Sequence, residues 1–195
     1  GSLNTRCTYF VTSPPSARWR ESAVSLVRLG VRCKLSYTIS VMHLGPVGVW
    51  LGGYGFAADD DRSNARELER LGYAALWFGE APGGKEAFVR ATTLLAATES
   101  LVIGTGIASI WGRDPLNTAC AIRTVGEAFP GRFVAGLGIS HPPAVAARGA
   151  DYRAPLTTMA DHLAAMAQAT HASPEPAEPV PVVLGALRRR MLELS

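Results

Sequence analysis

Short apolar segments alternate with amphipathic segments through most of this chain, and that alternation restricts the fold more than any other feature. Five largely apolar segments have the length of strands: 47–51, 74–78, 101–107, 132–139 and 182–185. Strands that are apolar on both sides are typical of a parallel sheet covered by helices. The sequence therefore predicts an α/β fold, and its periodicity leaves both a doubly wound sheet and a barrel open.

A helix is expected after each of these strands. In the fourth helix, apolar residues recur at intervals of three and four between Leu156 and Met166, as on one face of a helix. The aspartates at 59–61 are expected to cap the first helix, and Gly72 to end it. The predicted helices cover residues 59–71, 87–98, 114–129, 155–170 and 187–194.

Residues 1–41 differ in composition from the rest of the chain. Six basic residues stand there against a single acid, Glu21, and no period of two or 3.6 is sustained. We predict a poorly ordered N-terminal extension with one or two helical turns within 22–33. An Arg- and Ser-rich, acid-poor segment can be a transit peptide, but we favour an extension that precedes a natural start at Met42. Residues 42–195 then form one domain.

Charge and cysteine content narrow the possible functions. Without residues 1–41 the chain is slightly acidic, so nucleic acid is not expected as a partner, because such binding needs clustered Lys and Arg. The three cysteines, Cys7, Cys33 and Cys120, are widely spaced, which argues against a disulfide framework and favours a reducing cytoplasm. No apolar run approaches the ~18 residues of a membrane span, so no membrane partner is expected.

Several motifs of phosphate binding, nucleophilic catalysis and metal binding are missing. The Gly-x-Gly pairs at 104–106 and 136–138 lack the third glycine of a dinucleotide-binding loop. A Gly-Lys-Ser/Thr phosphate loop and a Gly-x-Ser-x-Gly elbow do not occur. The four histidines show no ligand spacing with Cys, Asp or Glu, so no metal site is expected.

Candidate site residues lie where the predicted strands end. Glu80 follows the second strand, Gly106 lies in the third, and Ser140 and His141 follow the fourth. In parallel α/β folds ligands bind at this edge. The alternatives are that Glu80 is a solvated acid or a helix cap, that Gly106 only marks a bulge, and that His141 is a turn residue before two prolines.

Further polar residues lie in the loops beyond the third and fourth strands. Trp111, Arg113 and Asp114 follow the third strand, and Asp114 before Pro115 is interpreted mainly as the cap of the next helix. Arg148 and Arg153 could contact an anionic ligand tail, but we interpret both as solvated loop residues.

Several segments together resemble one family. Their order and spacing are similar to those of the luciferase-like monooxygenase superfamily, and within it to the actinobacterial coenzyme F-420-dependent oxidoreductases. The resemblance covers about residues 42–195 and rests on the segments 76–80 (LWFGE), 101–107 (LVIGTGI), 113–133 (from RDPL to FPGRF), 135–141 (AGLGISH) and 181–187 (PVVLGAL).

The resemblance implies a (β/α)8 TIM barrel, here truncated to about five β/α units, with coenzyme F-420 or FMN at its carboxyl-terminal mouth. It implies a cis peptide bond at Gly106–Ile107 that supports the cofactor ring. It also implies that Ser140 and His141 contact the ring or act as acid and base, and that Glu80 lies near the cofactor or substrate. Some relatives carry a catalytic histidine directly after that acid, whereas this chain has Ala81.

These observations predict a flavin- or deazaflavin-dependent oxidoreductase that moves a hydride between its cofactor and a small organic substrate. Coenzyme F-420 is the first choice and FMN the second, with His141 and Glu80 as the expected catalytic residues. One alternative is a non-catalytic half-barrel, completed by self-association or by a partner. Another is a different phosphate-binding barrel enzyme. A complete barrel of eight units needs roughly 250 residues, more than the 195 present.

Overall fold

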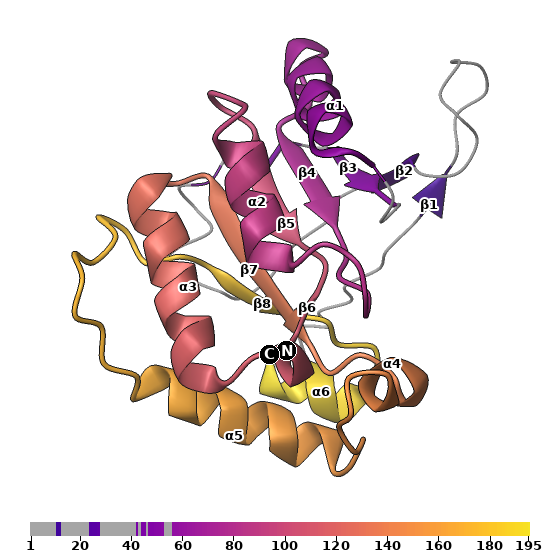
Figure 1. The fold of residues 1–195 in the computed structure, drawn as a ribbon, viewed down its shortest axis with the longest axis vertical. Coiled ribbons are helices and arrows are strands. Elements are labelled where there is room, and N and C mark those ends of the chain that lie inside the picture. Colours follow the sequence, from indigo (N-terminus) through magenta and orange to yellow (C-terminus); the bar gives the residue numbers. More distant parts are fainter. Residues whose placement is uncertain (1–10, 13–23, 28–41, 43, 46, 53–55) are drawn as a thin grey trace, which may run out of the picture.

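A parallel sheet forms the centre of the molecule. The computed structural model describes residues 11–12, 24–27, 42, 44–45, 47–52 and 56–195. The parallel strands lie side by side in the order of the chain, which confirms the predicted α/β fold (Figure 1). They are β3 (Gly48–Leu51), β4 (Ala75–Phe78), β5 (Val102–Thr105), β7 (Phe133–Gly138) and β8 (Val182–Leu184).

The third predicted strand is interrupted in the structure. β5 pairs with the first half of β7, where Ile103 lies opposite Phe133. A second short strand, β6 (Ala108–Ser109), pairs with the second half of β7, where Ala108 lies opposite Leu137. Residues 106 and 107 separate the two, so β5 and β6 follow one line along β7 with a break between them.

Antiparallel strands from the N-terminal segment extend the sheet. β1 (Val11–Thr12) pairs with β2 (Val24–Val27), and β2 pairs with β3, so that Val24 lies opposite Leu51. The expected helical turn within 22–33 is therefore wrong for residues 24–27. Valine and leucine suit a strand, and the backbone groups at the edge of β3 offer it a partner. The other residues of 1–41, expected to be poorly ordered, lie outside the described residues.

The five predicted helices are present. The first lies one residue earlier than expected, and the other four are shorter by one to three residues at one or both ends. In Figure 1, α1, α2 and α3 lie together on one side of the sheet. A short helix, α4 (Pro142–Ala146), and a 3-10 turn at Ile110–Gly112 were not expected. The helices are α1 (Ala58–Arg70), α2 (Ala87–Leu95), α3 (Pro115–Ala128), α5 (Pro155–Ala167) and α6 (Arg189–Leu194).

The start of α1 differs from the expectation. Its N-cap is Ala57, which makes no side-chain cap, and the three aspartates lie inside the first turn. Their negative charges still suit the positive end of the helix dipole. The end of the helix is as predicted, because Gly72 follows the last turn with φ +83° and its N–H donates to the Glu69 carbonyl. The sequence thus predicted the end of the helix better than its cap.

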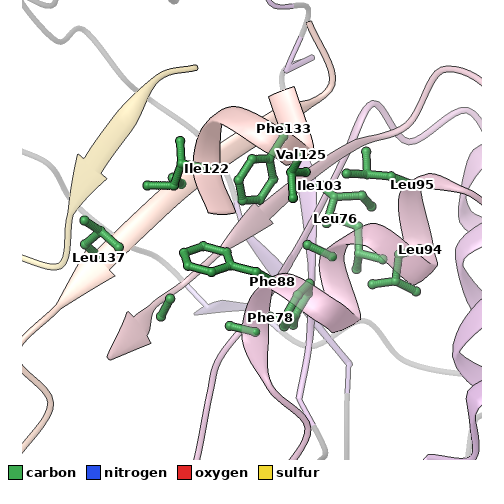
Figure 2. Packing of buried hydrophobic residues seen from close by; sticks show 14 of the residues in the cluster. Leu76, Phe78, Phe88, Leu94, Leu95, Ile103, Ile122, Val125, Phe133 and Leu137 are labelled. Atoms are coloured by element: carbon green, nitrogen blue, oxygen red, sulfur yellow. The ribbon is translucent and has the colours of Figure 1, made fainter. Parts of the chain in front are cut away.

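The main core lies between the sheet and the helices. Figure 2 shows Phe88 of α2 beside Phe133 of β7, with their ring centroids 6.0 Å apart and their planes at 84°. Leu76, Phe78 and Ile103 point into the same layer and have no exposed surface. Burying each large apolar side chain stabilises the fold by roughly 1.5–3 kcal/mol. This layer fixes the helices on the sheet and so fixes the strand ends.

The opposite face of the sheet is smaller and less completely covered. Its buried residues are Ala75, Val102 and Val134, and Trp77 packs partly over them. A Cβ atom at Gly104 would overlap the ring of Trp77, so the glycine makes room for the indole. Among the described residues, the buried indole N–H of Trp77 has no hydrogen-bond partner. In a closed barrel this face would line the interior.

Candidate functional site

The break between β5 and β6 lies beside the end of β4. The peptide bond between Gly106 and Ile107 is cis, as expected from the resemblance. The Gly106 N–H donates to the Phe78 carbonyl at 2.6 Å, and the Glu80 N–H donates to the Ile107 carbonyl at 3.2 Å. Backbone hydrogen bonds therefore bring the two predicted positions, Glu80 and Gly106–Ile107, together at the carboxyl edge of the sheet.

Glycines leave space for the side chains around this break. A Cβ atom at Gly106 would overlap the ring of Trp50 from β3. A Cβ atom at Gly185 would lie 2.9 Å from Ile107, and one at Gly138 would lie even closer to it. The Ile107 side chain thus packs over β7 and the residue after β8. No side chain larger than hydrogen fits at these positions without a shift of its neighbours.

Glu80 is buried and its carboxylate is fully engaged. Its side chain is 5% exposed. One oxygen accepts hydrogen bonds from the Ser109 N–H at 2.7 Å and from Arg113 at 3.1 Å, and the other accepts from Arg113 at 2.9 Å. Glu80 is therefore not a solvated acid, and it is not a helix cap either. The cap of α2 is Glu86, which accepts from the Val89 N–H at 2.7 Å.

Arg113 connects several segments around Glu80. Besides binding both oxygens of Glu80, its guanidinium donates to the Ser109 carbonyl at 2.8 Å and to Glu86 at 2.5 Å. It also lies over the ring of Phe88, 4.8 Å from the centroid. Two acids and an aromatic ring thus surround this arginine, which compensates the cost of burying its charge.

Arg148, which follows α4, reaches the same carboxylate. Its guanidinium lies 3.4 Å from Glu80, and its side chain is only 18% exposed. The interpretation of Arg148 as a solvated loop residue is therefore wrong, because α4 directs it back over the 3-10 turn. Arg153 is as expected: its side chain is 82% exposed and pairs with Asp151.

Ser140 and His141 lie at the turn between β7 and α4. Ser140 has a φ of +56°, which is uncommon outside glycine, and His141 is the N-cap residue of α4 without a side-chain cap bond. The His141 side chain is exposed and makes no hydrogen bond or ion pair with the described part of the chain. Its ring therefore stays open to solvent, and no hydrogen bond links it to Glu80.

Neighbouring contacts hold this turn in place. Trp111 of the 3-10 turn donates from its indole to the Ile139 carbonyl at 2.8 Å, and its ring lies 6.2 Å from that of Tyr152. Asp114 caps α3 as predicted, accepting from the Asn117 N–H at 2.9 Å. The sequence pointed to Trp111 and Arg113 only as loop residues, and gave no signal for the contact between Trp111 and Ile139.

A buried histidine lies between α5 and α3. His162 of α5 contacts the Thr118 hydroxyl of α3 at 3.3 Å. Burial lowers the pKa of His162, the positive charge of Arg113 lowers it further, and the charge of Asp114 acts in the opposite direction. Since the Thr118 hydroxyl donates to the Asp114 carbonyl at 2.7 Å, it accepts from the N–H of a neutral His162.

In the described ranges, no group of three or more His, Cys, Asp or Glu residues could hold a metal ion. No described helix combines the length and apolar character needed to cross a membrane.

The chain is similar to proteins of one family. The family model "Luciferase-like monooxygenase" matches residues 38–195. A 5,10-methylenetetrahydromethanopterin reductase of Methanolobus tindarius is 28% identical over 102 residues, which are 52% of this chain and 31% of that protein. The chain thus spans about a third of the length of this curated relative.

Solved structures share the fold at low sequence identity. The coenzyme F420-dependent tetrahydromethanopterin reductase of Methanopyrus kandleri has a TM-score of 0.58 and 17% identity, over 71% of this chain and 49% of that one. The oxygenating constituent of 3,6-diketocamphane monooxygenase from Pseudomonas putida, in complex with FMN, has a TM-score of 0.52 and 14% identity, over 58% and 34%. The sheet described above therefore corresponds to part of their barrels.

Proposed function

Because the chain belongs to the luciferase-like monooxygenase family, we propose that it is an oxidoreductase that uses a deazaflavin or flavin at the carboxyl edge of its sheet. The observation that carries this proposal is the family match over 38–195, which includes every candidate site residue. When bound, such a cofactor supplies the hydride chemistry, and the protein supplies binding, orientation and proton handling. The substrate class is a small organic molecule.

Coenzyme F420 is the first choice of cofactor and FMN the second. The choice follows the resemblance of the sequence motifs, and the fold is shared with both an F420-dependent reductase and an FMN-bound monooxygenase. The face of the sheet opposite the main core is compatible with the ring system of such a cofactor. Two partly exposed indoles, those of Trp50 and Trp77, lie over glycines there, and the Trp77 N–H is left without a partner among the described residues.

The residues next to the break between β5 and β6 have separate proposed roles. Gly106 and Ile107 support the ring from the sheet, and Ser140 contacts it from the end of β7. His141 is the proposed acid and base, because its ring is exposed and unbound, and histidine exchanges protons near neutral pH.

Glu80 is proposed as the polar residue that orders this edge of the site. Its acceptor positions are occupied by Ser109 and Arg113. A carboxylate held in this way fixes donors in place and is poorly suited to pick up a proton from a ligand. Its contribution is thus electrostatic and positional, while His141 carries the proton transfer.

Titration of the purified chain with coenzyme F420 and with FMN tests the proposal. Quenching of cofactor fluorescence is expected to saturate with at least one of the two. If both bind, the dissociation constant of F420 is expected to be the lower one. Binding of FMN alone would favour a flavin over a deazaflavin enzyme. Absence of saturable binding of both would contradict the proposed function of this chain.

The free edge of β8 supports a second candidate, a half-barrel that is completed by another copy or another protein. Among the described strands, β8 pairs only with β7, and its three residues are all apolar. Leu187, which follows, is 90% exposed. Unpaired edges favour association with a further strand. Sedimentation velocity would then show a concentration-dependent dimer, and the monomeric fraction would bind neither cofactor.

A further inference from the structure

The guanidinium of Arg148 is largely enclosed at the strand ends, yet its hydrogen-bonding capacity is unused. Its side chain is 18% exposed, and its nearest acid is Glu80 at 3.4 Å. Within the described part of the chain this guanidinium takes part in that ion pair but in no hydrogen bond. A guanidinium carries five N–H donors in a fixed planar arrangement, so most of its capacity is available to an incoming group.

Glu80 is already satisfied without Arg148. Arg113 binds both carboxylate oxygens, at 2.9 and 3.1 Å, and the Ser109 N–H binds one of them at 2.7 Å. The second nearby acid, Glu86, pairs with Arg113 and caps α2. Both acids therefore make their closest contacts with Arg113. The positive charge of Arg148 has only the longer ion pair with Glu80.

Gly112 allows Arg148 to lie close to the backbone of the 3-10 turn. A Cβ atom at Gly112 would be 2.8 Å from one Nη atom of Arg148 and 3.7 Å from a carboxylate oxygen of Glu80. Any larger residue would push the guanidinium away from this place. The arginine is thus held in a defined position between the turn and the loop after α4, and little entropy is lost when it binds a ligand.

We propose that Arg148 binds an anionic oxygen group, a carboxylate or a phosphate, of a ligand at the carboxyl edge of the sheet. Planar guanidinium groups match both anions with two parallel hydrogen bonds. Ligands of parallel α/β folds bind at this edge, where Glu80 and the break between β5 and β6 also lie. The inference rests on the proposed function for the place of the ligand, but not for the anion itself.

The anion has two sources, the phosphate of the cofactor and an acidic group of the substrate. Both present the same chemistry to Arg148, and the cofactor's phosphate can be removed in an experiment, because riboflavin is FMN without it.

The first experiment measures anion binding without any cofactor. Inorganic phosphate and acetate are titrated into the wild-type chain and into Arg148→Gln, Arg148→Lys and Arg153→Gln. The signal is intrinsic tryptophan fluorescence, to which Trp111 next to Gly112 contributes. The control residue, Arg153, is in the same segment but 82% exposed and paired with Asp151. Loss of charge-assisted hydrogen bonds is expected to weaken anion binding about tenfold or more in Arg148→Gln, and Arg153→Gln should stay within about twofold of wild type.

Arg148→Lys protects the test against a folding defect. Lysine keeps the charge but not the paired hydrogen bonds, so an affinity between those of wild type and Arg148→Gln is expected. Equal anion affinity in wild type and in a folded Arg148 variant would overturn the proposal, as would the absence of saturable anion binding by the wild-type chain.

The second experiment identifies the source of the anion. FMN and riboflavin are titrated into the same variants. If Arg148→Gln removes the preference for FMN over riboflavin, the anion is the cofactor's phosphate. If Arg148→Gln keeps the preference for FMN but loses the binding of inorganic anions, the anion that Arg148 binds belongs to the substrate. Failure of FMN, riboflavin and coenzyme F420 to bind the wild-type chain refutes the proposed function only, because the anion titrations are judged separately.

Discussion

Asp61 of α1 and Arg90 of α2 form a salt bridge of 2.7 Å in which both side chains are almost completely buried. Lys85 approaches the same carboxylate at 2.6 Å, and the Arg90 guanidinium lies 4.7 Å from the centroid of the Phe78 ring. The contact joins two neighbouring helices to each other and to the core under them. Asp61 thus serves tertiary structure, although its sequence position suggested a helix cap.

Replacing Asp61 by alanine is expected to destabilise the fold by about 3–5 kcal/mol, because it removes the carboxylate from a buried ion pair. The matched control is Asp60→Ala, since Asp60 lies in the same turn and is exposed. That change should stay within about 0.5 kcal/mol. Urea unfolding followed by circular dichroism measures both variants, and similar losses in the two would contradict the assigned role of the buried pair.

Glu69 is expected to make stability depend on pH at the acidic end. Its carboxylate accepts the backbone N–H groups of Glu99, Ser100 and Leu101 at 2.6–3.2 Å. Partial burial raises the pKa of Glu69. The hydrogen bonds together lower it by more than burial raises it, so the pKa falls below its usual value of 4.5. The stabilisation is therefore complete above pH 4.5 and is lost as the pH falls through the folded-state pKa.

The variant Glu69→Gln tests this assignment. An amide oxygen accepts these bonds less strongly than a carboxylate, so a loss of about 1–3 kcal/mol is expected at pH 7. The difference from wild type should shrink as the pH falls below 4.5, measured by thermal unfolding at several pH values. A difference that stays constant down to pH 3 would rule out the charged acceptor.

His162 is expected to destabilise the fold when it is protonated. Because burial and the charge of Arg113 lower its folded-state pKa below 6.5, the unfolded chain binds the proton more readily. Stability is then unaffected by this group above about pH 7, falls as the pH drops through 6.5, and levels off below the folded-state pKa. Melting temperatures of wild type and His162→Gln between pH 8 and 5 check this, and a wild-type profile that stays parallel to that of His162→Gln would contradict it.

Gly136→Ala is expected to be among the most disruptive small substitutions in this chain. The added Cβ would overlap the carbonyl oxygen of Thr105, and Thr105 exchanges two hydrogen bonds of 2.8 Å with the backbone of Gly136. A loss of about 3 kcal/mol or more follows from overpacking and a broken buried contact. The comparison is Gly149→Ala, where φ is +73° and space is open, with an expected cost of about 1–2 kcal/mol. Equal losses in denaturant unfolding would show that strand crowding is not decisive.

His141→Gln is expected to lower turnover without weakening cofactor binding. General acid–base catalysis contributes about 100- to 10,000-fold, so kcat should fall by at least the lower value. Fluorescence titration of the cofactor serves as the control. An unchanged kcat with any accepted substrate would remove His141 from the proton transfer.

The order of strands and helices was predictable because a strand that is buried on both faces is apolar along its whole length. β4 and β7 contain almost no polar residue, and Gly72 ends α1 through its own backbone geometry. The cis bond at the break in the third strand was expected only from the resemblance, and the isolated Gly106 pointed to no more than a bulge. Periodicity could not separate the break from the rest of residues 101–107.

Contacts between distant segments were not predictable in the same way. Nothing near Asp61 in the sequence distinguishes it from Asp60, yet only Asp61 faces Arg90. Likewise, Arg148 and Arg153 belong to one polar loop, and the turn after α4 determines which of them reaches Glu80. Residues 24–27 pair with β3 through their backbone, which side-chain patterns describe poorly.

The engagement of Glu80 by Ser109, Arg113 and Arg148 has a consequence for motion. Hydrogen bonds join the end of β4 to the 3-10 turn through one carboxylate, and the longer ion pair of Arg148 adds the loop after α4, so we expect the fluctuations of the three segments to be coupled. Amide hydrogen exchange in the three segments should therefore be correlated, with one common opening rate. In Glu80→Gln, each segment should instead open at its own rate. The opening of the segments would become uncorrelated although their folded structure is kept.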